Sequence, residues 1–104
     1  MTLDEVRARR EEIYATAARY GVDRMTVLTR QEFSLPYDFD VYVEVHFTDE
    51  ANARLDGLDY ATALADLQDD LSALLRCNVG VGDLDGKTDP AWFGEKMARQ
   101  AVPL

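Results

Sequence analysis

The sequence has little of what several specialised protein classes require. It contains one cysteine, Cys77, and one histidine, His46, so it can form no internal disulfide and offers no Cys/His cluster for zinc. No apolar run approaches the roughly 18 residues that span a bilayer, and the first residues lack the basic-then-apolar order of a signal peptide. These absences predict a small soluble domain of a reducing, cytoplasmic compartment with no membrane partner.

Basic residues are also scarce. The chain has 11 Lys plus Arg against 20 Asp plus Glu, which gives a formal net charge of −9. Binding of nucleic acid depends on a basic patch that neutralises phosphates, and the sequence shows no such patch. We therefore expect no direct nucleic-acid ligand.

What the sequence does contain is typical of one globular domain over residues 1–104, because 47% of its residues are hydrophobic. Thr2 and Glu5 have the spacing of a capping box and open a helix predicted over Leu3–Tyr20, with Gly21 as its left-handed end. Apolar and polar residues alternate from Asp38 to Phe47, which predicts a strand with one face on the core and one polar face. The other predicted elements are a strand over Met25–Leu28 that could extend to Phe33, a loop over Thr48–Gly57, a helix over Leu58–Arg76, a strand over Asn78–Val81, a loop over Gly82–Thr88 and a helix from Asp89-Pro90 to about Ala101, ended by Pro103.

This order of elements predicts an α+β (two-layer α/β) fold. Helices that alternate with about three strands are expected to cover one face of a small mixed three-stranded sheet. An exposed edge of the first strand could pair across a two-fold axis, so a homo-oligomer stays open, although nothing in the composition demands one.

Asp38 and Asp40 are the candidate catalytic and metal-binding residues. Two carboxylates separated by one residue on a strand point to the same face, with Cα atoms about 6.6 Å apart, and could converge on Mg²⁺. Such hard oxygen ligands let the metal neutralise charge on phosphate oxygens during phosphoryl or nucleotidyl transfer. In an acidic protein the same pattern is more often a solvated pair, so the predicted Mg²⁺ site is weak.

Several segments of the chain share their pattern with one known family. They are residues 7–21 in the first helix, Val27-Leu28, Asp38–Val43, residues 66–75 in the long helix, Val79–Val81 and residues 98–104. Through these segments nearly the whole chain resembles the minimal nucleotidyltransferases (MNT) of the DNA polymerase β superfamily, the antitoxins of HEPN/MNT toxin–antitoxin pairs. The resemblance implies a nucleotidyltransferase-like fold with the order helix, strand, Gly-Ser turn, D-x-D strand, helix, strand, helix.

The chain departs from this family where a nucleotide would be held. Thr29-Arg30 stands in the place of the Gly-Ser signature, and the bulk of these residues blocks close approach of a phosphate to the backbone. Gly80 stands in the place of the third carboxylate. Asp83 has the wrong parity to replace it in a regular strand, and Glu44 lies about 13 Å along the strand from Asp40.

The resemblance and these departures together imply a degenerate member, leaning away from an enzyme, that neutralises a HEPN-type ribonuclease as its antitoxin-like partner. An acidic surface of matching shape could occupy the basic groove that such a ribonuclease needs for RNA. The alternative is an active Mg²⁺-dependent nucleotidyltransferase that transfers AMP from ATP to a protein hydroxyl, with Asp38 and Asp40 as catalytic residues. A scaffold or regulatory subunit unrelated to toxins is a third hypothesis that the sequence does not separate from the first.

Other residues have a functional and a structural interpretation. His46 could be a general base, but no nucleophile stands at a suitable spacing. Arg30 could bind a phosphate or carboxylate as a fork, although a solvated arginine is more common. Structural roles are favoured for the rest: Cys77 as a small buried hydrophobe, Met97 with either Trp92 or Phe93 in the core while the other contacts a partner, and Gly82–Gly86 as a plain loop rather than a calcium site.

Overall fold

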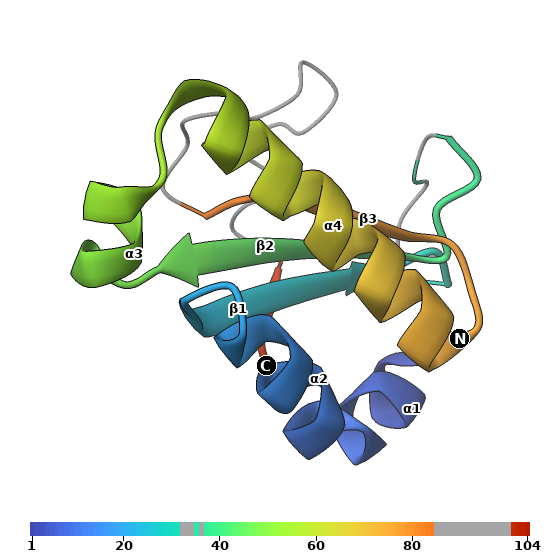
Figure 1. Ribbon diagram of the computed structural model, residues 1–104. Helices are drawn as coiled ribbons and strands as arrows, with labels where there is room; N and C mark the ends of the chain where they lie inside the picture. The colour runs from blue at the N-terminus through green and yellow to red at the C-terminus, as the bar shows by residue number, and fades with distance from the viewer. Residues whose placement is uncertain (32–34, 36, 85–100) are drawn as a thin grey trace.

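The computed structural model describes residues 1–31, 35, 37–84 and 101–104. Within them the chain forms the helices α1 (Leu3–Ala8), α2 (Arg10–Ala18), α3 (Asp49–Arg54) and α4 (Gly57–Leu75), and the strands β1 (Val22–Thr29), β2 (Val41–Phe47), β3 (Val79–Asp83) and β4 (Val102–Pro103). The sheet has the order β3-β2-β1-β4, and α1, α2 and α4 cover one of its faces (Figure 1). β2 runs antiparallel to β1 and parallel to β3, while β4 is antiparallel to β1. The predicted α+β two-layer fold with a mixed sheet is therefore confirmed.

The first helix is interrupted, whereas the sequence predicted one helix over Leu3–Tyr20. The predicted capping box is present: Glu5 N donates to Thr2 Oγ1 at 3.1 Å and Thr2 N donates to Glu5 Oε1 at 3.0 Å. At Arg9 the backbone leaves helical geometry, and its N–H donates to the Val6 carbonyl three residues back. Val6 of α1 and Ile13 of α2 are both buried, so the break lets each segment pack separately on a twisted sheet.

The two central strands are positioned by backbone conformation at their starts. Gly21 adopts φ +82°, the left-handed conformation expected after the first helix, and β1 begins directly after it. β2 begins at Val41 rather than at Asp38 as predicted, because Tyr37 and Asp38 adopt φ values of 56° and 59°. Extended backbone is incompatible with these angles, so the alternating pattern overstated the strand by three residues.

The second face of the sheet, for which the alternation predicted polar side chains, is covered. Tyr42 and Glu44 both lie on it and are each 4% exposed. Tyr42 forms a small cluster with Leu28 and Leu35, and Phe39 and Ala101 pack against that cluster. The chain that follows β1 therefore folds back over the sheet, which the period-two pattern alone does not reveal.

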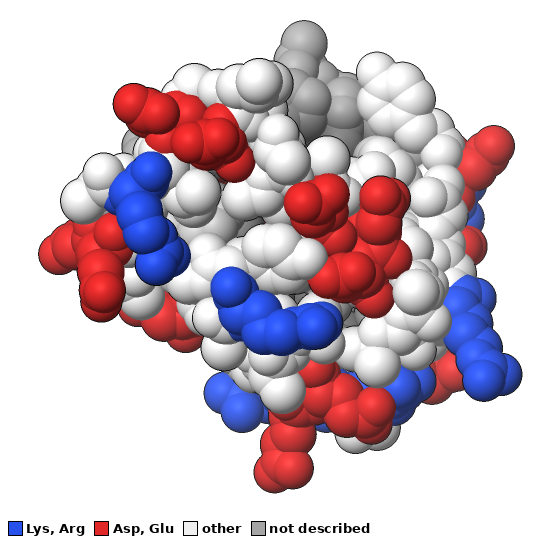
Figure 2. Space-filling model, viewed as in Figure 1, with Lys and Arg blue, Asp and Glu red and all other residues white. Residues whose placement is uncertain are grey.

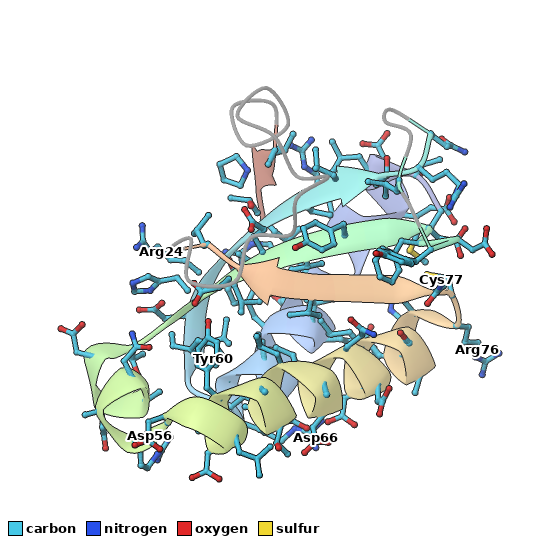
Figure 3. The ribbon with its side chains drawn as sticks, turned by 90° about the horizontal axis from the view of Figure 1, so that it is seen from above. Arg24, Asp56, Tyr60, Asp66, Arg76 and Cys77 are labelled. Atoms are coloured by element: carbon cyan, nitrogen blue, oxygen red, sulfur yellow. The ribbon has the colours of Figure 1, made fainter. Side chains whose placement is uncertain are left out.

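The segment after β2 contains a helix where a loop was predicted. α3 begins after Thr48, whose Oγ1 accepts a hydrogen bond from Ala51 N at 3.1 Å. α4 agrees with the predicted helix over Leu58–Arg76, and it ends at Arg76 with φ 55°. In Figure 3 Tyr60 lies between α4 and the sheet, and Asp66 points away from both.

The last strands extend the sheet at both edges. β3 agrees with the predicted strand but continues to Asp83, so Gly82 and Asp83 are not part of a loop. β4 is a fourth strand that was not predicted, and its Pro103 pairs opposite Thr26 at the sheet edge, where proline is tolerated. The predicted helix from Asp89-Pro90, with Trp92, Phe93 and Met97, and residues 85 and 86 of Gly82–Gly86 lie outside the described residues.

The main core lies between the helices and the first face of the sheet. It is built from valines of the three long strands and the inward stripe of α4, namely Val27, Val41, Val43, Val45, Val79, Leu67, Leu71 and Leu75. Among the described residues, no helix combines the length and the apolar composition that crossing a membrane requires.

Candidate functional site

Asp38 and Asp40 lie in the turn before β2 and not on a shared strand face. Asp38 is exposed at positive φ, while Asp40 is half-buried. Asp40 Oδ2 accepts a hydrogen bond from Asn78 N at 3.1 Å, and Asp40 N donates to the Asn78 carbonyl at 2.8 Å. The geometric premise for the metal pair was therefore wrong, and Asp40 joins the start of β2 to the start of β3.

Thr29 and Arg30, which stand in the place of the Gly-Ser signature, lie at the turn end of the hairpin formed by β1 and β2. Arg30 Nε donates to the Phe39 carbonyl at 2.8 Å, and its NH2 group donates to the Leu35 carbonyl at 3.2 Å. Arg30 N also donates to the Asp40 carbonyl at 2.9 Å. The guanidinium is exposed to solvent, as the more common role of an arginine predicts, and its two hydrogen bonds also connect the two arms of the hairpin. Thr29 before it is buried.

An aromatic ring occupies the place of the third carboxylate. A Cβ atom added at Gly80 would lie 2.6 Å from the ring of Phe39, and one added at Gly82 would lie 1.9 Å from the hydroxyl of Tyr42. Both distances are shorter than any normal carbon contact, so the glycines are required for these aromatic side chains to lie on β3. No side chain fits at position 80 while Phe39 stays where it is.

The acids of β2 and β3, Glu44 and Asp83, do not replace the missing carboxylate. Asp83 pairs with Val45 and Glu44 pairs with Gly82, in an unbroken parallel register. Their side chains therefore lie on opposite faces of the sheet, as the parity of the strand predicts. Both are almost fully buried.

His46 and Asp23 form a pair that the sequence did not indicate. His46 Nδ1 lies 2.6 Å from Asp23 Oδ1, and this contact joins the end of β2 to the start of β1. The hydrogen bond from His46 lowers the pKa of Asp23 below its usual value. Because Asp23 stands at an irregularity of the strand register, only the folded chain reveals that it reaches His46.

Cys77 lies between α4 and β3 and is half-buried. It packs against the main core, as predicted for a small hydrophobe. Burial, with a smaller contribution from Asp40, raises the pKa of its thiol, and a raised thiol pKa lowers the thiolate fraction needed for nucleophilic chemistry.

Acidic side chains gather over the outer side of α4 (Figure 2). Asp59, Asp66 and Asp69 are exposed there. Asp70 accepts a hydrogen bond from the Tyr20 hydroxyl, and Arg19 NH2 lies 3.7 Å from it. A shallow groove of about 370 Å³ lies beside this ridge, and Asp59 and Asp66 line it together with Tyr20, Arg54, Leu55, Thr62 and Ala63.

Among the residues that the structure describes, no three His, Cys, Asp or Glu side chains form a group that could hold a metal ion. Comparison with models of known protein families found no match, and neither did comparison with curated proteins or with solved structures. Membership of the minimal nucleotidyltransferase family, and Asp38 and Asp40 as its catalytic and Mg²⁺-binding residues, therefore stay predictions.

Proposed function

We propose that this protein is a degenerate nucleotidyltransferase-like protein that acts by binding, as the antitoxin-like partner that neutralises a HEPN-type ribonuclease. The order of the described elements supports the proposal, because helix, strand, strand, long helix and strand follow one another as the family resemblance implies. The additional α3 is a short insertion between β2 and α4.

The observation that carries the proposal is that polar groups at the turn end of the β1–β2 hairpin already form hydrogen bonds within the chain. A nucleotide needs free backbone N–H groups and a positive side chain to hold its phosphates. Here Arg30 uses its side chain and its own N–H on carbonyl groups of the same hairpin, and Asp40 accepts from Asn78. With Phe39 over Gly80 as well, the polar groups of this end stabilise the fold and are not arranged around a triphosphate.

The acidic ridge of α4 supplies the binding surface in this proposal. Asp59 and Asp66 are seven residues apart and therefore lie on the same side of the helix, where both line a groove that also contains apolar side chains. A ribonuclease presents basic side chains toward its RNA. Opposite charge accelerates such an encounter and fixes its orientation, while the apolar side chains of the groove add contact area.

Co-expression with a HEPN-like protein encoded by a neighbouring gene tests the proposal. We expect the two proteins to co-purify at low salt, RNA cleavage to be inhibited, and association to slow as salt is added. Asp66→Lys should weaken the complex about tenfold, since it places a like charge at the interface. Glu11→Lys, an equal change of charge on exposed α2, is the matched control and should have a smaller effect. Absence of a complex at low salt, or of any HEPN-like neighbour, would contradict the proposal.

Transfer of AMP is measured in the same mixture. With labelled ATP, Mg²⁺ and the partner, we expect no label on either protein. Label that disappears in the Asp38→Asn, Asp40→Asn double variant would instead establish the alternative enzyme with these residues as its catalytic pair. Label that persists in the double variant would exclude them.

A further inference from the structure

A second hollow lies at the end of the sheet opposite to Asp40 and Cys77. It has a volume of about 330 Å³ and is lined by residues of α2, β1 and β4 and by Leu84 and Leu104, which follow β3 and β4. Arg10 and Tyr14 of α2 line it together with Arg24 and Thr26 of β1, and Pro103 is among its apolar lining residues. Figure 3 shows Arg24 at the far end of the sheet from Cys77.

The two arginines bring positive charge to this cavity, and the nearby charge of Arg24 contributes to the lowered pKa of Asp23. Within the described part of the chain neither Arg10 nor Arg24 forms an ion pair. The contrast with the rest of the molecule is large, because the chain as a whole carries a net charge of −9. Two guanidinium groups beside one cavity are therefore a local site for negative charge.

Arg10 is held in place before any ligand arrives. Its Nε donates to the Leu104 carbonyl at 2.5 Å, and its guanidinium carbon lies 4.6 Å from the centre of the Tyr14 ring. Tyr14 is fixed in turn, since its hydroxyl accepts from Met25 N at 3.2 Å. One of the five guanidinium N–H groups is used in this way, which leaves the others for a ligand at little cost in entropy.

Thr26 provides an independent sign of a missing partner. Its hydroxyl oxygen is buried and makes no hydrogen bond to any residue of the chain that the structure describes. A buried hydroxyl without a partner costs stability, so native proteins rarely keep one without a reason. A ligand oxygen in the cavity would accept hydrogen bonds both from this hydroxyl and from the arginines.

The acids nearest in register do not line the cavity. Glu44 is the cross-strand neighbour of Thr26 but is itself buried, and Asp23, next to Arg24, is engaged by His46. Apolar side chains of Met25, Leu84, Pro103 and Leu104 complete the lining. The site therefore favours a ligand with one charged end and one apolar end.

We propose that this cavity binds a small organic oxyanion, a carboxylate or phosphate monoester on an apolar group, through Arg10, Arg24 and the Thr26 hydroxyl. Its volume suffices for a small aromatic acid, since ligand sites begin at about 300 Å³. The proposal does not depend on a ribonuclease partner, because it concerns residues on the sheet and α2 rather than the α4 ridge.

Titration of the whole protein with benzoate and phenyl phosphate, followed by NMR, tests it. We expect both anions to shift the Met25 amide and the Nε–H signals of Arg10 and Arg24, while neutral benzyl alcohol does not. A preference for benzoate assigns the site to carboxylates, and a preference for phenyl phosphate assigns it to phosphate monoesters. No shift with either anion up to about 10 mM, or equal shifts with benzyl alcohol, would overturn the proposal.

Two variants separate ligand binding from a structural role. Arg24→Gln should weaken binding of the preferred anion about tenfold or more, because charge-assisted hydrogen bonds are lost. Thr26→Val should weaken it severalfold while leaving the melting temperature of the free protein equal or higher, since it removes a hydroxyl that has no partner. Arg54→Gln, outside the cavity, is the control. Unchanged affinity in both cavity variants would overturn the assignment of the site.

Discussion

The ring of Phe39 lies against the backbone of Gly80, so close that a Cβ atom at position 80 would be 2.6 Å from its nearest carbon. This contact places the turn before β2 on top of β3. It also occupies the position where the family resemblance expects the third carboxylate, so one packing contact stabilises the second face of the sheet and excludes an acidic ligand there.

Gly80→Ala is expected to destabilise the protein by about 1–3 kcal/mol, because the added methyl must displace the Phe39 ring or move the strand. The free energy of unfolding from urea titration measures the effect. Phe39→Ala should remove the clash, so the double variant should lose clearly less than the sum of the two single variants. Additive losses would show that the two positions do not interact.

Arg30 is expected to contribute to folding through its two carbonyl contacts. Arg30→Ala should lower the free energy of unfolding by about 1–2 kcal/mol, since two hydrogen bonds from a charged group are lost. Arg30→Lys should not restore the stability, because an ammonium group cannot reach both carbonyls as the planar guanidinium does. Urea titration checks both, and Arg54→Ala serves as the control. Full rescue by lysine would mean that charge, and not geometry, matters at this position.

Asp40 is expected to act through its acceptor oxygen. Asp40→Asn keeps an oxygen for Asn78 N and should change the free energy of unfolding by less than about 0.5 kcal/mol, whereas Asp40→Ala should cost about 1 kcal/mol. Amide hydrogen exchange at Asn78 is the local measurement, and it should accelerate in the alanine variant alone. Equal losses in both variants would indicate that the negative charge itself is needed.

The sequence predicted the elements that local signals define and missed those that depend on distant contacts. The capping box at Thr2 and the helix α4 each depend on signals from residues close together in the sequence, and both were predicted correctly. Thr48 is the N-cap of α3, but the polar segment after it gives no apolar periodicity that would predict a helix. β4 has two residues, and only its pairing with β1 makes it a strand.

The candidate site was predicted less well for the same reason. The alternation through Asp38 and Asp40 gave the right face for Val41 to Phe47, but it could not show that Tyr37 and Asp38 adopt positive φ. Those angles allow Phe39 to reach Gly80, a contact across 41 positions of sequence. Arg24 and Thr26 belong to no sequence motif, because their cavity is formed with residues of α2 and β4 and with Leu84 and Leu104, which are distant in the sequence.

The hydrogen bond between Tyr20 and Asp70 makes the stability of the protein vary with pH in the alkaline range. The Tyr20 hydroxyl donates to Asp70, and this hydrogen bond, with smaller effects of burial and of the charges of Asp70 and Asp66, raises the pKa of Tyr20 from 10.0 to about 12. The folded state thus favours the protonated phenol. Its contribution is complete below pH 10, the unfolded value, and is lost as the pH rises from 10 toward 12.

We therefore expect the free energy of unfolding of the wild-type protein to fall more steeply between pH 10 and 12 than that of Tyr20→Phe. Urea titrations at stepped pH measure the difference, and tyrosinate absorbance should show one tyrosine fewer ionising above pH 11 in the variant. Tyr14→Phe is a poor control because the Tyr14 hydroxyl accepts from Met25 N, so Tyr37→Phe, at a 73% exposed side chain, is preferable. If the free energy of unfolding depends on pH in the same way for wild type and Tyr20→Phe, Tyr20 and Asp70 are not hydrogen-bonded in solution. Asp70 could then contact a partner without breaking a hydrogen bond to Tyr20.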